Sequence, residues 1–171
     1  MKAALSLLAI CTLSACMGGG NGVVSSSAMV GSSLATAVPS LPQAPVDNSF
    51  AGMLNEVRAD NGSDPVTYDA RLGRAAQIHA DDMLAMGTMT HTGSDGSNAG
   101  QRITRQNYQW RTWGENVARG QQNEESVLNA WVNSPGHQAN NVNPNFEDFA
   151  LAKAGSGSQL YWELVFASER R

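Results

Sequence analysis

A change in composition near residue 47 limits where this chain can build a core. Residues 17–46 consist mainly of Gly, Ser, Ala and Pro, without charged side chains and without a helical period. Such a segment is typical of a flexible tether, and the alternative, folding over a domain, would bury few large apolar groups. We therefore predict one domain over residues 47–171, a length that supports one good core.

The first fifteen residues have the features of an export signal. Lys2 supplies a positive start, and Ala3–Ile10 form an apolar stretch that is too short to span a bilayer. Leu13–Cys16 then resembles the lipobox of bacterial lipoproteins, which implies cleavage before Cys16 and lipids on its amino group and sulfur. An ordinary secretory signal, cleaved near Ala15, is the alternative.

A lipidated Cys16 would make the lipid bilayer a partner of this protein. Each buried acyl methylene contributes about 0.8 kcal/mol, so several acyl chains anchor a protein firmly. Residue 17 is Met and not Asp, and the resemblance to lipoproteins then implies sorting to the outer membrane. We expect an exported protein of the cell envelope that faces the periplasm or the surface.

Cysteine and lysine content exclude two further classes. Cys11 and Cys16 are the two cysteines, and removal of the signal would leave Cys16 alone, so no internal disulfide is expected. The formal net charge is −4, and after Lys2 the chain has one lysine, Lys153. Because no basic patch is present, nucleic acid is not expected as a partner.

Capping residues and apolar spacing predict four helices in the domain. The first begins after a cap at Asp47, Asn48 or Ser49 and ends at Asn61-Gly62; the second runs from Asp69 to Gly87. A shorter third helix is expected within Asn98–Asn107, and a fourth after Asn123. The expected inward residues are Phe50, Met53, Leu54, Val57, Leu72, Ala75, Ala76, His79, Met83, Met86, Val127, Leu128, Trp131 and Val132.

Strand signals concentrate in the second half of the domain. Tyr108, Trp110, Trp113 and Val117 indicate an extended aromatic stretch. The clearest signal is a pair of apolar runs, residues 146–154 and 160–167, joined by a Gly/Ser-rich segment that favours a hairpin. Helices and strands together predict the α+β class.

Three separated motifs carry the chemistry. His91 precedes a Gly/Ser/Asp loop, Glu115 lies between Gly and Asn in an apolar stretch, and His137 follows Ser-Pro-Gly. Two imidazoles and a carboxylate are components of a divalent-metal site or an acid–base site. Only a fold could bring them together, because they lie far apart in the chain.

The chain resembles a bacterial member of the CAP superfamily, named after cysteine-rich secretory proteins, antigen 5 and pathogenesis-related proteins; its domain is also called the SCP domain. The resemblance covers almost all of residues 50–167. The motifs that carry it occur in this order: Leu54-Asn55 with Arg58, His79 with Asp82-Met83, His91–Gly96, Arg102-Ile103, Gly114–Ala118, Trp131–His137 and Tyr161-Trp162.

The resemblance implies an α–β–α sandwich with a central antiparallel sheet and an open cleft lined by two histidines and two acidic residues. Transferred to this chain, the cleft residues are His91, Glu115 and His137. The second acidic position falls on Ser134, so one carboxylate of the pattern is missing. This departure disfavours any chemistry that needs two cleft carboxylates.

Each cleft candidate also has a structural interpretation. His91 could lie in a surface turn, and His137 could lie at a helix end and interact with the helix dipole. Burial of Glu115 requires a partner, which could be a backbone donor or an arginine and not a metal.

Five other positions are expected to be structural. His79 is expected along a helix face without chemistry, and Ser134 as a cap, since no G-x-S-x-G elbow is present. The acidic spacing around Asp95 does not match an EF-hand calcium loop. Trp110 and Trp113 are expected in the core and sheet, with a groove as the alternative.

Two functional hypotheses follow. The favoured one is a non-enzymatic binding module whose cleft takes a lipid, peptide or envelope ligand. The alternative is a divalent-metal-assisted hydrolase, in which His91 and His137 hold an ion such as Zn²⁺ and Glu115 assists through water. Two histidines alone would bind zinc weakly, because catalytic zinc usually has three protein ligands.

Overall fold

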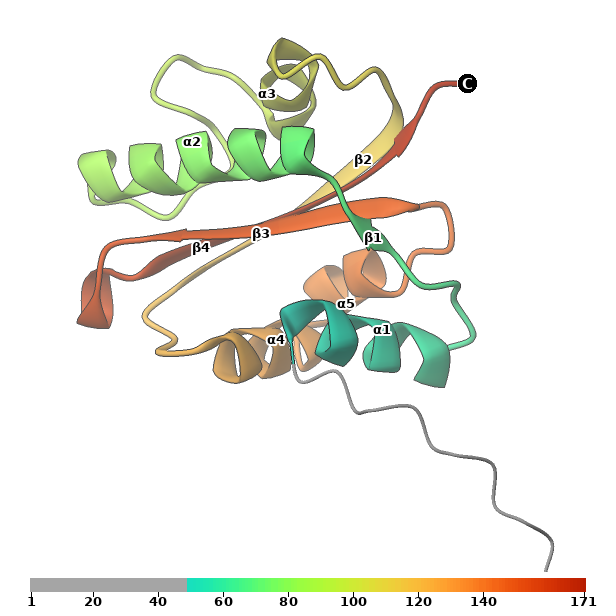
Figure 1. Cartoon of the computed structure of the whole chain (residues 1–171). Helices are drawn as coiled ribbons and strands as arrows, with labels where there is room; N and C mark the ends of the chain where they lie inside the picture. Colours follow the sequence, from blue (N-terminus) through green and yellow to red (C-terminus); the bar gives the residue numbers. More distant parts are fainter. Residues whose placement is uncertain (1–48) are drawn as a thin grey trace, which may run out of the picture. The chain divides into compact units, whose positions relative to one another are not determined.

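Figure 1 shows the computed structural model, in which residues 49–171 are described. The predicted signal peptide, Cys16 and the predicted tether lie outside the described residues. The elements in chain order are α1 (Phe50–Asp60), β1 (Thr67–Tyr68), α2 (Ala70–Met86), α3 (Ala99–Arg105), β2 (Trp110–Arg119), α4 (Glu124–Val132), α5 (Pro135–Asn141), β3 (Asp148–Ala154), the short 3-10 helix η1 (Gly157–Gln159) and β4 (Tyr161–Glu169).

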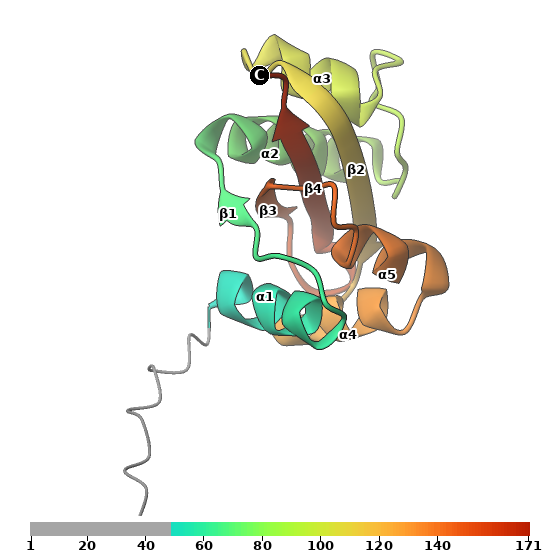
Figure 2. The same cartoon turned by 90° about the vertical axis from the view of Figure 1, so that its right-hand side faces the viewer.

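One four-stranded sheet forms the middle layer, in the order β1-β3-β4-β2. β4 pairs antiparallel with both β2 and β3, whereas β1 adds two residues parallel to β3. Figures 1 and 2 show α2 and α3 on one side of the sheet and α1, α4 and α5 on the other. The predicted α–β–α sandwich is therefore confirmed.

The four predicted helices are confirmed, together with their capping residues. Side chains of Ser49, Asp69, Asn98 and Asn123 accept hydrogen bonds from backbone N–H groups in the first turns of α1, α2, α3 and α4. These bonds satisfy donors that would otherwise lack partners at a helix start. Gly87 ends α2 in a left-handed conformation (φ 67°), which glycine adopts without steric cost.

Four details differ from the sequence predictions. Met86 was expected to face inward, but it is 37% exposed because it lies at the last turn of α2. Strand β1 and helix α5 were not predicted. The two apolar runs do form an antiparallel pair, as predicted, but the connection between them contains η1.

The two faces of the sheet carry different side chains. Alternation along β4 places Trp162, Leu164 and Phe166 against the α1/α4/α5 layer and Val165 against the α2 layer. On the face toward α2, strand β3 carries Ala150, Ala152 and Ala154. Helix α2 packs against them with Ala75, Ala76 and Ala80. Among residues 49–171, no helix combines the length and apolar character needed to cross a membrane.

Candidate functional site

Glu115 lies in the middle of β2, at one edge of the sheet. It is opposite Val165 of β4 and therefore faces the α2 side, and its side chain is only 4% exposed. Its Oε2 accepts a hydrogen bond from Nδ1 of His91 at 2.7 Å, and its Oε1 accepts one from the guanidinium of Arg102. The expectation that a buried Glu115 needs a partner is confirmed, and an arginine is among its partners.

A glycine is required immediately before Glu115. A Cβ at Gly114 would lie 2.7 Å from the Phe146 ring and 3.2 Å from Oδ1 of Asn140. The first of these distances is shorter than real Cβ contacts, so the ring would have to move. Gly114 thus lets β2 approach the α5 side closely.

The loop that carries His91 is held in place from two directions. Asp82 of α2 accepts the backbone N–H of Ser94 at 2.7 Å. Arg102 of α3 donates to the Ser97 carbonyl at 2.8 Å and to the His91 carbonyl at 3.4 Å. The His91 side chain itself is 59% exposed. The fold therefore presents an exposed imidazole on a fixed backbone, hydrogen-bonded to a buried carboxylate.

Asn116 positions the segment that carries His137. Its amide donates to the His137 carbonyl at 3.1 Å and to Oδ1 of Asn141 at 2.9 Å. Asn140 donates to the Glu115 carbonyl at 3.1 Å and to Oδ1 of Asn116 at 2.8 Å. Consecutive residues of β2 therefore serve opposite sides of the sheet, with Glu115 facing α2 and Asn116 holding α5.

His137 lies in the first turn of α5, and not near a C-terminus. His137 therefore does lie at a helix end, as the structural interpretation expects, and at this N-terminal end the dipole disfavours a charged imidazole. Burial lowers the pKa of His137, and the nearby His91 lowers it further. Ser134 occupies the expected N-cap position of α5, where its carbonyl accepts the N–H of Gln138 at 2.8 Å, but its side chain makes no capping hydrogen bond.

An open cleft of about 360 Å³ lies beside His91 and Glu115. The structure thus brings two of the three predicted cleft residues into direct contact, while His137 interacts electrostatically with His91 but is not among the lining residues. The lining is mostly polar and consists of His91, Thr92, Asn98, Trp113, Gly114, Glu115 and Asn140.

Trp113 is the aromatic surface of this cleft. It packs edge-to-face with Trp110, with ring centroids 6.4 Å apart, and a Cβ at Gly100 would lie 2.5 Å from its indole nitrogen. Trp131 and Trp162 are fully buried. Trp110 and Trp113 lie in β2 and pack, partly buried, against the core on the α2 side, as expected, and Trp113 in addition lines the cleft.

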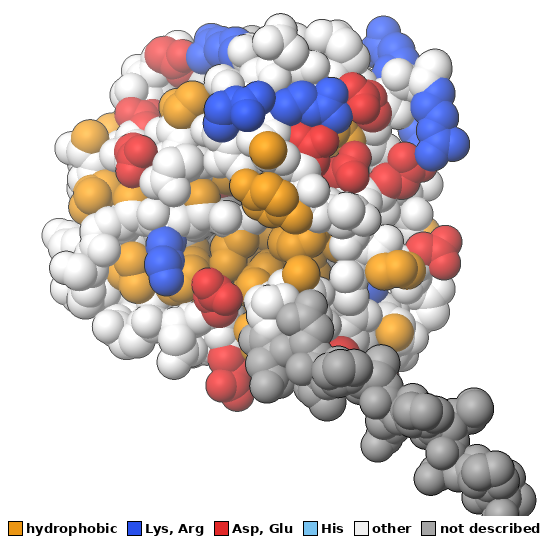
Figure 3. Space-filling model, in the orientation of Figure 1, with side chains coloured by type: hydrophobic (Ala, Val, Ile, Leu, Met, Phe, Trp, Pro, Cys, Tyr) orange, Lys and Arg blue, Asp and Glu red, His pale blue; other side chains and the backbone are white. Residues whose placement is uncertain are grey.

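A larger hollow of about 650 Å³ contains none of the predicted site residues. It is lined by Met53, Gln122, Asn123, Glu124, Glu125 and Lys153. Figure 3 shows that apolar side chains reach the surface between the two helical layers on the drawn face, where no histidine is visible. The size of a hollow therefore does not identify the site. The candidate acid–base and metal-binding side chains lie around Glu115.

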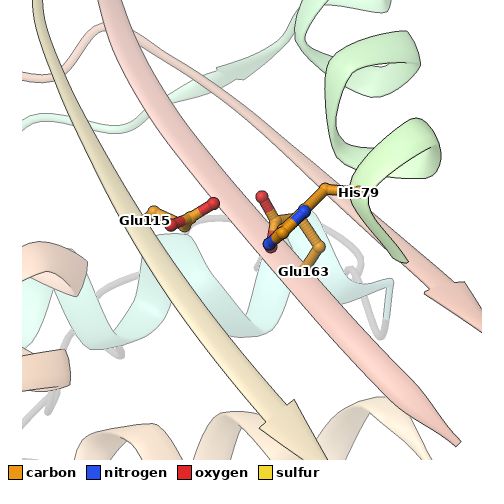
Figure 4. A group of neighbouring side chains, drawn as sticks. All are labelled: His79, Glu115 and Glu163. Carbon is orange, nitrogen blue, oxygen red and sulfur yellow. The ribbon is translucent and has the colours of Figure 1, made fainter. Parts of the chain in front are cut away.

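A second group of polar side chains lies behind Glu115. His79 of α2 and Glu163 of β4 are both fully buried, and with Glu115 they place one nitrogen or oxygen atom each within 4.8 Å of one another. Figure 4 shows these three side chains pointing toward a common region from three elements. We call them the buried triad.

Most polar atoms of His79 and Glu163 have no hydrogen-bond partner. Nε2 of His79 lies 2.7 Å from the Thr90 carbonyl and must be the protonated nitrogen, because a carbonyl only accepts. Nδ1 of His79 has no hydrogen-bond partner, and neither has a carboxylate oxygen of Glu163 while that group is ionised. When protonated, Glu163 donates a hydrogen bond to Glu115. The ionic neighbour of Glu163 is Arg102, at 3.7 Å.

Burial and neighbouring charges shift the pKa values of Glu163 and Glu115 in opposite directions. Burial raises the pKa of Glu163 well above its usual range, and the nearby Glu115 carboxylate raises it further. Burial also raises the pKa of Glu115, but hydrogen bonds from His91 and Glu163 and the charge of Arg102 more than offset this, and the net shift is downward. Glu115 is therefore the ionised member of the two at neutral pH.

The two histidines near these acids also differ. Burial lowers the pKa of His79, and the Arg102 charge lowers it further, so this imidazole is neutral. The hydrogen bond to Glu115 raises the pKa of His91. The exposed imidazole is thus the one that gains a proton more readily.

Sequence reasoning missed Glu163 and the role of Arg102, and it placed His79 along a helix face without chemistry. A detectable signal existed for Glu163, which is the one acidic residue within the apolar run 160–167. The same reasoning that singled out Glu115, a carboxylate interrupting apolar residues, applies to it. His79 gave no such signal, because a histidine at helical spacing is compatible with ordinary packing.

Comparison with known proteins supports the resemblance. The family model described as "Cysteine-rich secretory protein family", CAP, matches residues 51–168. The uncharacterized protein YkwD of Bacillus subtilis is 30% identical over 123 residues, covering 72% of this chain and 48% of YkwD. The chain therefore spans about half the length of this curated relative.

Solved structures share the fold at lower identity. An extracellular protein of Bacillus anthracis that contains an SCP domain matches with a TM-score of 0.64 and 21% identity, covering 70% of this chain and 39% of that one. An outer surface protein of Borrelia burgdorferi matches with a TM-score of 0.65 and 22% identity, covering 71% and 90%. The family model spans most of the domain, and the chain belongs to the CAP, or cysteine-rich secretory protein, family.

Proposed function

We propose that this chain is an exported, membrane-tethered binding module that holds a polar polymer of the cell envelope in the cleft beside Trp113 and His91. The composition of the cleft carries the proposal: one indole surface stands among an imidazole, a carboxylate and two asparagine amides. The ligand is expected to be a sugar-containing or peptide-containing polymer.

The polarity of the cleft favours such a polymer over a lipid. An apolar chain would desolvate the amides of Asn98 and Asn140 without replacing their hydrogen bonds, which costs free energy. A sugar ring or peptide group can instead pack on the Trp113 face and bond to the surrounding donors and acceptors. The exposed His91 imidazole is oriented by Glu115 and adds a polar contact that becomes cationic as pH falls.

Export and tethering rest on the N-terminal sequence. The signal features and the lipobox-like segment ending at Cys16 support secretion followed by lipidation. The B. anthracis structure is of an extracellular protein and the B. burgdorferi structure is of an outer surface protein, which agrees with an envelope location for this chain. Incorporation of labelled palmitate into the wild type and its loss in Cys16→Ala test this part.

The cleft proposal is tested by co-sedimentation of the protein with insoluble peptidoglycan, with liposomes as the competing surface. Trp113→Ala should weaken sedimentation with peptidoglycan by about 10-fold, corresponding to the ~1.4 kcal/mol of a typical aromatic contact residue. Trp110→Phe, on the same strand but outside the cleft lining, is the matched control. Wild-type protein that does not sediment with peptidoglycan, or equal binding by Trp113→Ala, would contradict the proposal, whereas liposome binding through an acylated Cys16 is expected of both proteins.

A second candidate function is the divalent-metal-assisted hydrolase that uses His91, Glu115 and His137. The hydrogen bond between His91 and Glu115 supports it, because a histidine oriented by a carboxylate is a common acid–base pair. The missing cleft carboxylate at Ser134 weighs against it. Hydrolase profiling of the wild type beside Glu115→Gln separates the two candidates, since activity that survives this substitution would not come from the cleft.

A further inference from the structure

We propose that the buried triad, His79, Glu115 and Glu163, is a binding site for one divalent transition-metal ion of the Zn²⁺ type. This site lies behind the cleft and uses neither His91 nor His137 as a ligand. It goes beyond the proposed polymer binding and does not depend on it.

The sheet register explains how the triad forms. Glu163 is opposite Val117 and Glu115 is opposite Val165, so the two glutamates are diagonal neighbours on the same face of adjacent strands. Diagonal side chains lie within reach of one another when they are long. His79 approaches the same point from α2, and Figure 4 shows the convergence of the three side chains.

The unsatisfied atoms indicate a ligand. Nδ1 of His79 lacks a hydrogen-bond partner although the residue is fully buried, and both oxygens of the buried Glu163 lack one while it is ionised. A proton on Glu163 would supply one hydrogen bond, to Glu115, and would leave Nδ1 of His79 and the second Glu163 oxygen without partners. Buried polar atoms without partners are costly, and each calls for an explanation such as a bound ion. One ion within reach of the triad would contact all three groups at once.

His79 is prepared for metal binding. Its Nε2 donates to the Thr90 carbonyl, which fixes the tautomer and leaves the lone pair of Nδ1 toward the two carboxylates. Histidine ligands of metals typically donate their second ring nitrogen to a carbonyl or carboxylate in this way. One imidazole and two carboxylates are ligands that Zn²⁺ accepts.

Glu115 is also fixed by neighbours outside the triad. His91 donates to Oε2 and Arg102 donates to Oε1, so the carboxylate is oriented while each oxygen retains a further lone pair. Because Glu115 also lines the cleft, it connects the buried triad to solvent. An ion would reach the triad past the exposed His91.

Charge sets the class of ion and limits its affinity. Two carboxylates face the single guanidinium of Arg102, which leaves one negative charge uncompensated when both are ionised. A proton on Glu163 would cancel this charge, but one proton cannot satisfy both the other Glu163 oxygen and Nδ1 of His79. A divalent cation contacts all these atoms, with Arg102 weakening its binding by repulsion.

Calorimetry of the purified protein with ZnCl₂ alone tests the proposal. We expect one equivalent of Zn²⁺ in the wild type and in His137→Ala. Glu163→Gln should lose more affinity than the roughly 10- to 100-fold that loss of an outer-shell partner costs. Glu163→Gln keeps the side-chain shape and, because Glu163 is the protonated one of the two acids, leaves the buried charge of the metal-free protein unchanged. Circular dichroism should therefore show a folded protein.

Three outcomes would overturn the site. No heat in the wild type would show that a proton alone occupies the triad. Equal heats in wild type and Glu163→Gln would place the ion elsewhere. Loss of binding in His137→Ala, with Glu163→Gln unchanged, would move the ion into the cleft.

Spectroscopy of the wild type decides the matter even if a variant fails to fold. X-ray absorption of the zinc-loaded protein should show one imidazole and additional oxygen ligands. Two imidazoles would instead indicate the His91/His137 pair and contradict the buried site. Binding of polymer to the cleft can fail while this signature persists, so the two proposals are tested separately.

Discussion

The two sides of the sheet stabilise the domain by different means. Toward α1, α4 and α5 the sheet presents large apolar side chains such as Trp162 and Phe166, which pack on Phe50 and Trp131. Toward α2 it presents alanines, together with the fully buried Glu163. The first side depends on buried apolar volume, and the second on close approach and on compensation of charge.

This difference explains why the polar chemistry lies on the α2 side. The alanines on α2 and β3 provide little apolar volume, so long polar side chains can converge beside them. On the aromatic side, rings fill the space; Phe146 and Phe166 stack with centroids 5.3 Å apart. The following substitutions test this contrast.

Arg102→Met should have the largest effect. Arg102 is the guanidinium that faces both Glu115 and Glu163, and breaking a buried ion pair by removing one partner costs about 5 kcal/mol at the upper end of the measured range. Urea denaturation measures the loss. Arg105→Met, at a pair whose side chains are more than half exposed, is the control.

Combining Arg102→Met with Glu115→Gln should recover part of the lost stability, because the double variant no longer has the buried carboxylate that lost its guanidinium. If Arg102→Met were no more destabilising than Arg105→Met, the electrostatic account of the α2 side would be wrong.

Phe166→Ala should have the second largest effect. It should lower the free energy of unfolding by about 4 kcal/mol, because the ring is fully buried and its removal leaves a cavity. Val165→Ala is the matched control, because it changes the adjacent residue on the opposite face of the same strand. We expect a smaller loss of unfolding free energy there. Equal losses of unfolding free energy in the two variants would contradict the claim that the α1/α4/α5 side depends more on buried apolar volume than the α2 side.

Ala152→Leu should lower the free energy of unfolding by about 2 kcal/mol, because the larger side chain overpacks the core. Ala152 is opposite Glu163 and belongs to the closely packed alanines beneath α2. Lys153→Leu, at the exposed neighbouring position, should change the thermal midpoint little. A neutral Ala152→Leu would mean that the α2 layer can move away without penalty.

Asp69→Ala should have the smallest effect at neutral pH, about 1 kcal/mol, the usual cost of losing an N-cap. Burial raises the pKa of Asp69, but hydrogen bonds and the charge of Arg71 lower it further, to a net value below 3.8. A depressed folded-state pKa contributes stability that is present above 3.8 and is lost as pH falls through the folded value. The difference between wild type and variant should therefore shrink in acid.

Denaturation curves at several pH values check this prediction, with Asp60→Ala at the exposed end of α1 as the control. A difference that stays constant down to the lowest pH at which the protein folds would contradict the assigned role of Asp69.

Local features of the fold could be predicted from sequence, and long-range features could not. The caps Ser49, Asp69, Asn98 and Asn123 act on neighbours two or three residues away, so local patterns locate them. β1 has two residues and exists because β3 lies beside it, about eighty positions along the chain. No local pattern contains that information.

The site divides in the same way. The carboxylate of Glu115 within an apolar stretch predicts a buried, partnered acid, and the family resemblance added His91. The convergence of His79 with Glu163 depends on the register of β2 against β4 and on the position of α2 above both strands. A sequence pattern alone does not specify such a register.

Adjacent residues of β2 serve opposite layers, and this makes strand alignment a determinant of function. Because side chains alternate, a slip of β2 by one residue would turn Glu115 toward α5 and Asn116 toward α2. The hydrogen bond between His91 and Glu115, the hydrogen bonds from Asn116 to α5 and the buried triad would all be lost in one step. Substitutions that loosen this edge strand should therefore inactivate the cleft as an all-or-none event, even where the helices stay folded.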